Sequence, residues 1–456
     1  MKSRLLSPVG GIICLALAAC GGGGAAPPSS PAAPSSAAAK PSTVAPASSA
    51  AAAASAKPAA STAASAAAKP AASGSAAAKP AASGAAAAST GPLKIGLPVS
   101  TSGALAQLGK AMENGFKMYL AEVGNKAGGR DITVVTEDEA TNPATGLQKV
   151  KKLVEQDQVN ILAGLVLTPS TYASVDYLQK EAPRKVMLVG LNAGANDMDT
   201  TRKSDLFVRT AFSNAQANIP MGDYVFNTLG VKKVYLTYSD FAAGPEKVET
   251  FAAGYKKAGG QVVGTEKPKL GETDFATYLT KIRASDAEAT YNFEAGNDGV
   301  QFVKQYDQFG LKAKIKPLGA GDNVDDVGLP AEGSAAVGWI TALHYYSTLD
   351  NPQNKKFAAD YKSRYSDNAN AYAVQAYDGA KLIVDALNKT NGNADPAALL
   401  SAMLGAKWDS PRGPVSISPD YHDIVQNIYV AETKSVNGQV QNVVSKTFEA
   451  VQPVAK

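Results

Sequence analysis

From Leu93 onward, short apolar runs alternate with longer amphipathic runs, and this alternation constrains the fold more than any other feature of the chain. Leu93–Val99 predicts a buried strand, and Met112, Phe116 and Tyr119 recur at helical spacing in the run that follows. A repeated alternation of strand and helix is typical of parallel sheets covered by helices on both faces. Further strands are predicted at 132–136, 160–165, 186–190, 207–210, 233–237, 261–264, 289–293, 316–318, 339–342, 428–431 and 443–448.

Two such alternating blocks follow one another, and later segments can return to either block. We therefore expect an α/β fold of two Rossmann-like lobes, each a parallel sheet flanked by helices, joined by a hinge. Ligands of such sheets bind outside the carboxyl ends of the strands, so the cleft between the lobes is the expected site. The expected boundaries are 93–212 plus 340–409 for lobe 1 and 213–339 plus 410–456 for lobe 2.

The first residues have the layout of a secretory signal. Lys2 and Arg4 precede an uncharged apolar run, Leu5–Leu17, that is too short to span a membrane. Leu-Ala-Ala-Cys, ending at Cys20, resembles the bacterial lipobox, in which the cysteine is acylated and becomes the first residue. We expect a signal peptide at 1–19 and an extracytoplasmic protein, in the periplasm or at the cell surface, anchored by lipid on Cys20. The alternative is a chance cysteine after an ordinary signal peptide.

Residues 20–92 form a low-complexity segment of Ala, Ser, Pro and Lys with almost no large apolar side chain. Such a segment buries too little surface to offset the entropy of ordering, so it is expected to be a disordered linker. Lys-Pro-Ala-Ala-Ser recurs at Lys57, Lys69 and Lys79. We expect a tether between the lipid and the folded lobes; an interaction motif within it is the alternative.

Charge and motif content exclude several classes of function. The formal net charge of +4 comes from the N-terminal segment, because no acidic residue precedes Glu113 and six of the 44 basic residues precede Gly91; beyond them stand 38 basic and 40 acidic residues. A nucleic-acid partner is therefore not expected. Two histidines and no cysteine beyond Cys20 offer neither a metal site nor a Ser-His or Cys-His centre. Since nucleotide-binding loops and a nucleophile elbow are also missing, we expect neither enzymatic activity nor a cofactor.

Several blocks resemble the branched-chain amino acid (Leu/Ile/Val) binding family of ABC-transporter solute-binding proteins, which has the type I periplasmic binding protein fold. The blocks lie at 94–109 (KIGLPVSTSGALAQLG), 138–154 (DEATNPATGLQKVKKLV), 207–216 (FVRTAFSNAQ), 372–382 (YAVQAYDGAKL) and 410–430 (SPRGPVSISPDYHDIVQNIYV). The resemblance implies a protein, expected to be monomeric, that closes over a small ligand and then docks on ABC permease subunits.

The resemblance also implies where the ligand lies. Its carboxylate-recognition loop matches Val166, Leu167 and Thr168, where backbone amides and a hydroxyl can hold an anion at a helix N-terminus; a plain Thr-Pro-Ser helix cap is the alternative. Tyr372 matches an aromatic residue that lies against the ligand, or is a core residue. The remaining matched positions of the first lobe are Ser102, Leu108, Asn192, Ala193 and Gly194.

Departures from the family concern the groups that hold a ligand ammonium. One acidic position matches Asn214, a second falls near Gly321 with Asp322 adjacent, and a tyrosine of the second lobe is replaced by Ala295. Tyr238 and Phe241 follow a strand of that lobe and can stack on a ligand. The pattern favours a small organic or aromatic acid. A branched-chain or other amino acid is the alternative ligand, and a sensor of the same fold that signals to a partner is the alternative role.

Overall fold

The computed structural model describes residues 91–453, all of which lie in one compact unit, Ser83–Lys456. The expected signal peptide, the lipid-bearing Cys20 and nearly all of the linker lie outside the described residues. None of the helices in the described part combines the length and the apolar character that a membrane crossing requires.

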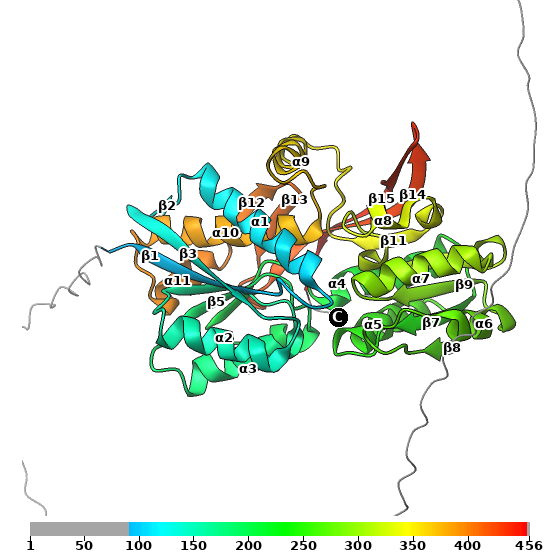
Figure 1. Cartoon of the computed structure of the whole chain (residues 1–456), viewed down its shortest axis with the longest axis horizontal. Coiled ribbons are helices and arrows are strands. Elements are labelled where there is room, and N and C mark those ends of the chain that lie inside the picture. Colours follow the sequence, from blue (N-terminus) through cyan, green and yellow to red (C-terminus); the bar gives the residue numbers. More distant parts are fainter. Residues whose placement is uncertain (1–90, 454–456) are drawn as a thin grey trace, which may run out of the picture. The chain divides into compact units, whose positions relative to one another are not determined.

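The first sheet has six strands in the order β2-β3-β1-β4-β5-β6. Its strands β1, β4 and β5 are parallel, and β4 and β5 are fully buried apolar runs, as expected for a sheet covered on both faces. Helices α2 and α3 lie on one side of the sheet and α1 and α10 on the other (Figure 1). The bounds are β1 Leu93–Val99, β2 Lys126–Ala127, β3 Arg130–Asp138, β4 Ile161–Gly164, β5 Met187–Gly190, β6 Phe207–Arg209, α1 Ala106–Glu122, α2 Pro143–Glu155, α3 Thr168–Lys180, α10 Ala371–Lys389 and α11 Pro396–Met403.

The second sheet has nine strands in the order β12-β13-β14-β11-β10-β9-β7-β8, with β15 paired to β14. Four of its strands, β7 to β10, form the parallel block that the alternating pattern predicts, β11 adds a fifth parallel strand, and the C-terminal strands add antiparallel pairs. The bounds are β7 Lys233–Tyr238, β8 Gln261–Glu266, β9 Ala289–Phe293, β10 Lys316–Ala320, β11 Ile340–Leu343, β12 Lys407–Ser410, β13 Gly413–Ile417, β14 Ile424–Val436, β15 Gln439–Val451, α4 Asn214–Asn227, α5 Ala243–Lys257, α6 Ala276–Ala284, α7 Asn297–Gln308, α8 Leu329–Glu332 and α9 Pro352–Tyr365.

Two segments expected in lobe 1, residues 340–343 and 407–409, contribute to strands of the second sheet, the latter through the pairing of β12 with β13. The segment starting at residue 340 was expected in lobe 1, but β11 pairs with β10 and β14 and so belongs to the second sheet. The reason is pairing: the apolar run of β11 completes the parallel ladder of β10, and no sequence pattern specifies which sheet a short strand joins.

Asn437-Gly438 lies between the predicted strands at 428–431 and 443–448 and is typical of a two-residue hairpin turn, and the structure confirms that turn. Both residues have positive φ, 53° and 81°, and they join β14 to β15 with Val436 opposite Gln439. Such a conformation at both central positions matches the right-handed twist of the flanking strands. The resulting long hairpin, labelled β14 and β15 in Figure 1, joins the second sheet through β14, which also pairs with β11 and β13.

A buried arginine joins the segments that pass between the two sheets. The side chain of Arg412 is fully buried between β12 and β13, and its Nε donates to Asp378 of α10 at 2.7 Å. Its other nitrogens donate to the carbonyls of Thr210 and Ala211 and to the side chain of Gln426. A single guanidinium thus holds β6–α4, α10 and β14 together.

We expect Arg412→Ala to lower the free energy of unfolding by about 3–5 kcal/mol, because it leaves the buried Asp378 carboxylate without its cation. Urea denaturation of the full chain measures the change. The control is Arg364→Ala, an exposed arginine on α9, which should change stability by less than about 0.5 kcal/mol. Equal stability of the two variants would refute the role given to Arg412.

Candidate functional site

A cavity of about 540 Å³, open solvent at its mouth included, lies between the two sheets at the carboxyl ends of their strands. We call it the main pocket. The loops after β4 and β5 and the start of α1 line it from the first sheet, and the loops after β7, β9 and β10 line it from the second. This is the position at which open parallel sheets bind ligands. Its lining residues are Leu105, Leu108, Val166, Leu167, Thr168, Pro169, Asn192, Gly194, Phe212, Asn214, Phe241, Ala242, Ala243, Lys247, Phe293, Ala295, Gly296, Asp322 and Tyr372.

Most residues expected at the site line this pocket. They are Leu108, Val166, Leu167, Thr168, Asn192, Gly194, Asn214, Phe241, Ala295, Asp322 and Tyr372.

Ser102, Ala193 and Tyr238 do not line the main pocket. The exposed Ser102 hydroxyl donates to Asp138 at 2.6 Å. The carbonyl of Ala193 accepts a hydrogen bond from Arg209, and the Tyr238 ring packs against Gly244 at the start of α5.

The loop from β4 to α3 differs from expectation in its hydrogen bonds. The amides of Val166 and Leu167, expected to hold a ligand anion, donate to the buried Glu139 carboxyl at 2.8 and 3.3 Å. Burial raises the pKa of Glu139, while hydrogen bonds from these amides and from the Ser100 hydroxyl oppose the rise. The β4–α3 loop is therefore held in place by the internal Glu139 carboxyl group. Thr168, in the first turn of α3, contributes a hydroxyl group to the lining of the main pocket.

The charged centre of the main pocket is a buried pair that sequence reasoning found only in part. The Lys247 ammonium, on α5, contacts the Asp322 carboxylate, and the Tyr372 hydroxyl donates to Asp322 at 3.2 Å. The side chains of Lys247 and Asp322 are only 7% and 9% exposed. Lys247 lies in the first turns of a helix whose N-terminus faces the cleft, where a cation is unfavourable without a partner. That unusual placement is the signal that could have identified it.

Three phenylalanine rings form the apolar walls. The Lys247 ammonium lies 4.8 Å from the Phe212 ring centroid and 4.6 Å from that of Phe293, within range of a cation–π interaction. The rings of Phe241 and Phe293 have centroids 5.8 Å apart. Phe212 was missed although it lies in the β6–α4 loop two residues before Asn214, because only tertiary packing brings its ring to Lys247 at the pocket wall.

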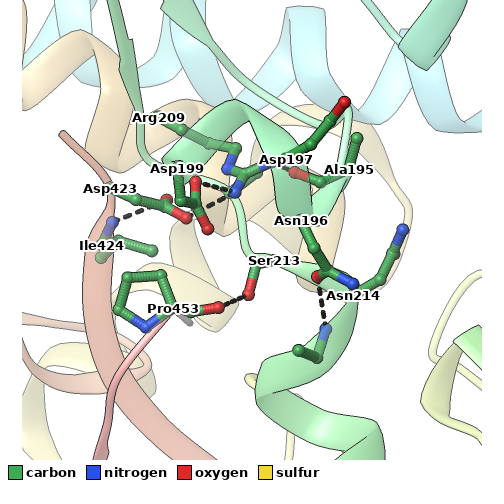
Figure 2. A network of polar contacts seen from close by, with 12 residues as sticks. Ala195, Asn196, Asp197, Asp199, Arg209, Ser213, Asn214, Asp423, Ile424 and Pro453 are labelled. Carbon is green, nitrogen blue, oxygen red and sulfur yellow. Dashed lines mark hydrogen bonds and ion pairs between the residues drawn. The ribbon is translucent and has the colours of Figure 1, made fainter. Parts of the chain in front are cut away.

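Asn214, expected at a position of ammonium recognition, has a different contact. Its Nδ2 donates to Glu246 of α5 at 2.6 Å, and the second oxygen of Glu246 accepts from the backbone of Asn196 at 2.8 Å. Asn196 also caps α4 through a hydrogen bond from Ala215 to its side chain (Figure 2). Glu246 thus joins a loop of the first sheet to the N-terminus of α4.

A second buried guanidinium positions the loop that carries Asn192 and Gly194. Arg209 donates to the carbonyls of Ala193 and Ala195 at 2.9 Å each and pairs with Asp199 and Asp423 (Figure 2). Burial and the neighbouring Asp423 raise the pKa of Asp199, although Arg209 opposes the rise. The carboxyl groups of Asp199 and Asp423 therefore share the guanidinium of Arg209. The same guanidinium holds the loop after β5 through its hydrogen bonds to the two carbonyls.

Comparison with known proteins gives consistent matches. The model of a periplasmic binding protein family matches residues 92–439. The Leu/Ile/Val-binding protein homolog 6 of Brucella melitensis is 34% identical over 363 residues, which cover 78% of this chain and 92% of that protein.

Two solved structures of Rhodopseudomonas palustris solute-binding proteins of ABC transporters are similar in fold and sequence. The BisB5 protein, in complex with 3,4-dihydroxybenzoic acid, is 36% identical with a TM-score of 0.75. The HaA2 protein, in complex with p-hydroxybenzoic acid, is 35% identical with the same TM-score. Each comparison covers 79% of this chain and 98% of the other.

A pH dependence follows from Glu294, which lies beside Ala295 in the β9–α7 loop. Burial raises its pKa from 4.5 to about 8, although Thr237 and Ser239 oppose the rise. The folded state then holds a proton that the unfolded state releases between these values, so stability should fall as pH rises from 4.5 to 8, by at most about 1.4 kcal/mol per pH unit.

We expect Glu294→Gln to remove this contribution to the dependence of the free energy of unfolding on pH. Denaturant unfolding at several pH values measures that dependence. Asp205→Asn, at an exposed carboxylate, should keep the slope of the unmodified chain. An unchanged slope in the Glu294 variant would contradict the assignment.

Proposed function

Because this chain belongs to the periplasmic binding protein family, as a solute-binding protein of an ABC transporter, we propose that it captures an aromatic carboxylic acid between its lobes. It is a binding protein and not an enzyme, and the family is extracytoplasmic. Closure of the lobes over the ligand completes the site, and the loaded protein delivers the ligand to a membrane permease.

The observation that carries the proposal is the pairing of Lys247 with Asp322. An α-amino acid brings an ammonium, and a buried cation requires an acidic partner. Asp322, the acidic side chain that lines the main pocket, is already paired with the ammonium of Lys247 from α5. Asn214 carries no charge, and its side-chain amide is hydrogen-bonded to Glu246. The pocket therefore offers a ligand ammonium no unpaired carboxylate.

The walls favour a flat, apolar ligand body. Phe212, Phe241 and Phe293 contribute rings, and aliphatic side chains such as Leu105 and Leu108 complete the surface. Aromatic rings pack on such walls in stacked or edge-to-face arrangements. The hydroxybenzoic acids bound by the two R. palustris proteins belong to this class of ligand.

Two groups are available to the ligand carboxylate. The Thr168 hydroxyl lies at the first turn of α3, where the helix dipole favours an anion. The Lys247 ammonium has hydrogen-bond donors beyond the one directed at Asp322. With the amides of Val166 and Leu167 bound to Glu139, these two groups take the role that the sequence assigned to the amides.

We further propose the arrangement of the whole chain. Residues 1–19 direct export, Cys20 carries lipid, and the linker to residue 92 tethers two lobes to the membrane. Lobe 1 comprises 93–212 and the helices returning after residue 343, whereas 340–343 belongs with lobe 2 because of its strand pairing. We expect a monomer, since one chain supplies both walls of the pocket.

The first test is calorimetric titration of the full chain with benzoate and with leucine. Benzoate should bind, and leucine should not. Binding of leucine in the absence of benzoate binding would overturn the proposed ligand class and favour an amino-acid binder.

Lys247→Met should weaken benzoate binding by about tenfold or more, since it removes the buried ammonium while keeping side-chain length. The matched control is Lys257→Met, an exposed lysine near the end of the same helix, which should bind benzoate as the unmodified chain does. Equal affinities of the two variants would refute the role of Lys247.

Lipid attachment is tested by cell fractionation. Cys20→Ala should release the exported protein from the membrane fraction, whereas Cys14→Ala, within the expected signal peptide, should remain membrane-bound. A Cys20 variant that still sediments with membranes would refute the anchor.

A further inference from the structure

The two lobes meet at two places along the main pocket. Gly296, in the β9–α7 loop of the second lobe, lies so close to the first lobe that a Cβ atom added to it would be 3.2 Å from the carbonyl oxygen of Ala104 and 3.3 Å from Leu105. At the second place, the Tyr372 hydroxyl of α10 donates to Asp322 at 3.2 Å. The structure therefore holds the lobes in contact across the pocket.

A third contact between the lobes lies outside the pocket lining. The Oε1 atom of Glu246, in the first turn of α5, accepts a hydrogen bond from the backbone amide of Asn196 at 2.8 Å. Asn196 begins the short 3₁₀ turn after β5 in the first lobe, whereas α5 follows β7 in the second. Neither Glu246 nor Asn196 lines the main pocket. Glu246 thus joins the two lobes from outside the ligand cavity.

Both ends of this contact are anchored in their own lobes. The ring of Phe251 on α5 stacks on Tyr291 of β9, which fixes the helix to the second sheet. The turn that begins at Asn196 is fixed to the first lobe, since Arg209 donates to the carbonyl of Ala195 at 2.9 Å (Figure 2). Because neither end can yield locally, we expect this hydrogen bond to break when one lobe moves relative to the other.

The second oxygen of the Glu246 carboxylate is also bound. Oε2 accepts from Nδ2 of Asn214, the first residue of α4, at 2.6 Å. Oδ1 of the same Asn214 side chain is buried and has no hydrogen-bond partner among the described residues. An acidic residue at a helix N-terminus is favourable through the helix dipole alone. Two directed hydrogen bonds go beyond that role and hold the carboxylate in one orientation.

The same turn of α5 carries the ammonium that faces the ligand. Lys247 directly follows Glu246, and successive residues of an α-helix point roughly 100° apart. Lys247 therefore lines the main pocket while Glu246 contacts the first lobe. A ligand held by Lys247 against the first lobe and the Glu246 contact thus require the same position of α5.

We propose that Glu246 is a latch that holds the lobes closed, a positioning residue that favours the closed form without touching the ligand. The inference rests on the proposed function, capture by closure, and adds the group that stabilises the closed form. The apparent dissociation constant of a ligand that binds the closed form is its intrinsic value divided by the closed fraction. Glu246 therefore strengthens binding by raising that fraction.

Calorimetric titration of the full chain with benzoate tests the latch. Glu246→Ala should weaken benzoate binding by about tenfold, because the closed form loses hydrogen bonds to a charged group. Loss of a negative charge near the pocket would by itself strengthen the binding of an anion, so the two effects have opposite signs. The matched control is Glu249→Ala, which removes the same charge from an exposed position of the same helix and should leave the affinity unchanged. Equal affinities of these two variants would overturn the latch.

A conservative variant separates the hydrogen bonds from the charge. In Glu246→Gln the side-chain oxygen can still accept from Asn196, and the new amide can donate to the unpaired Oδ1 of Asn214 once the Asn214 amide turns over. This variant should bind benzoate within about threefold of the unmodified chain. A glutamine variant that binds as weakly as the alanine variant would overturn the role given to the hydrogen bonds.

The distance between the lobes gives a readout that a merely structural role would not change. Dyes attached in Gln148→Cys on α2 and Thr277→Cys on α6, both exposed positions, report this distance by energy transfer once the native cysteines are replaced by alanine. Benzoate should close the labelled chain, and adding Glu246→Ala should raise the concentration that gives half-closure by about tenfold. Closure at the same concentration in both chains would overturn the latch and leave the proposed function standing. Failure of benzoate to close either chain would overturn the proposed function and the latch together.

Discussion

The ammonium of Lys247 lies buried between two phenyl rings and against the Asp322 carboxylate, and the chemistry of the cleft depends on this contact. A buried ion pair contributes little to stability once the cost of desolvation is counted. Its importance here is for selectivity, because it neutralises the carboxylate that a ligand ammonium would require. The Lys247 ammonium also keeps hydrogen-bond donors beyond the one directed at Asp322, in a pocket whose other walls are largely apolar.

Internal charges also hold the loops around the pocket in place. Glu139 accepts the amides of the β4–α3 loop, Arg209 holds the carbonyls of the loop after β5, and Glu246 joins Asn196 to Asn214. Glu139, Arg209 and Glu246 hold these loops without lining the main pocket themselves. The binding surface is therefore organised before a ligand arrives, which lowers the entropy cost of binding.

Much of the site could be predicted because strand ends are visible in the sequence. The loops after β4, β5 and β10 supply Thr168, Asn192 and Asp322, which were expected at the cleft and line it. What could not be predicted is the partner of each group. Lys247 and Asp322 are 75 residues apart in sequence, and the amide-binding Glu139 precedes its loop by 27. No local pattern specifies such contacts, since they depend on how distant helices and strands pack.

The sequence alone determined the α/β class, the two alternating blocks and the Asn437-Gly438 hairpin, because periodicity and turn chemistry are local properties of the chain. The tertiary structure decided that β11 joins the second sheet, that Glu139 accepts hydrogen bonds from the Val166 and Leu167 amides, and that Lys247 of α5 pairs with Asp322 in the cleft. These features arise where segments far apart in sequence meet, and their energies come from burial and pairing that only packing creates.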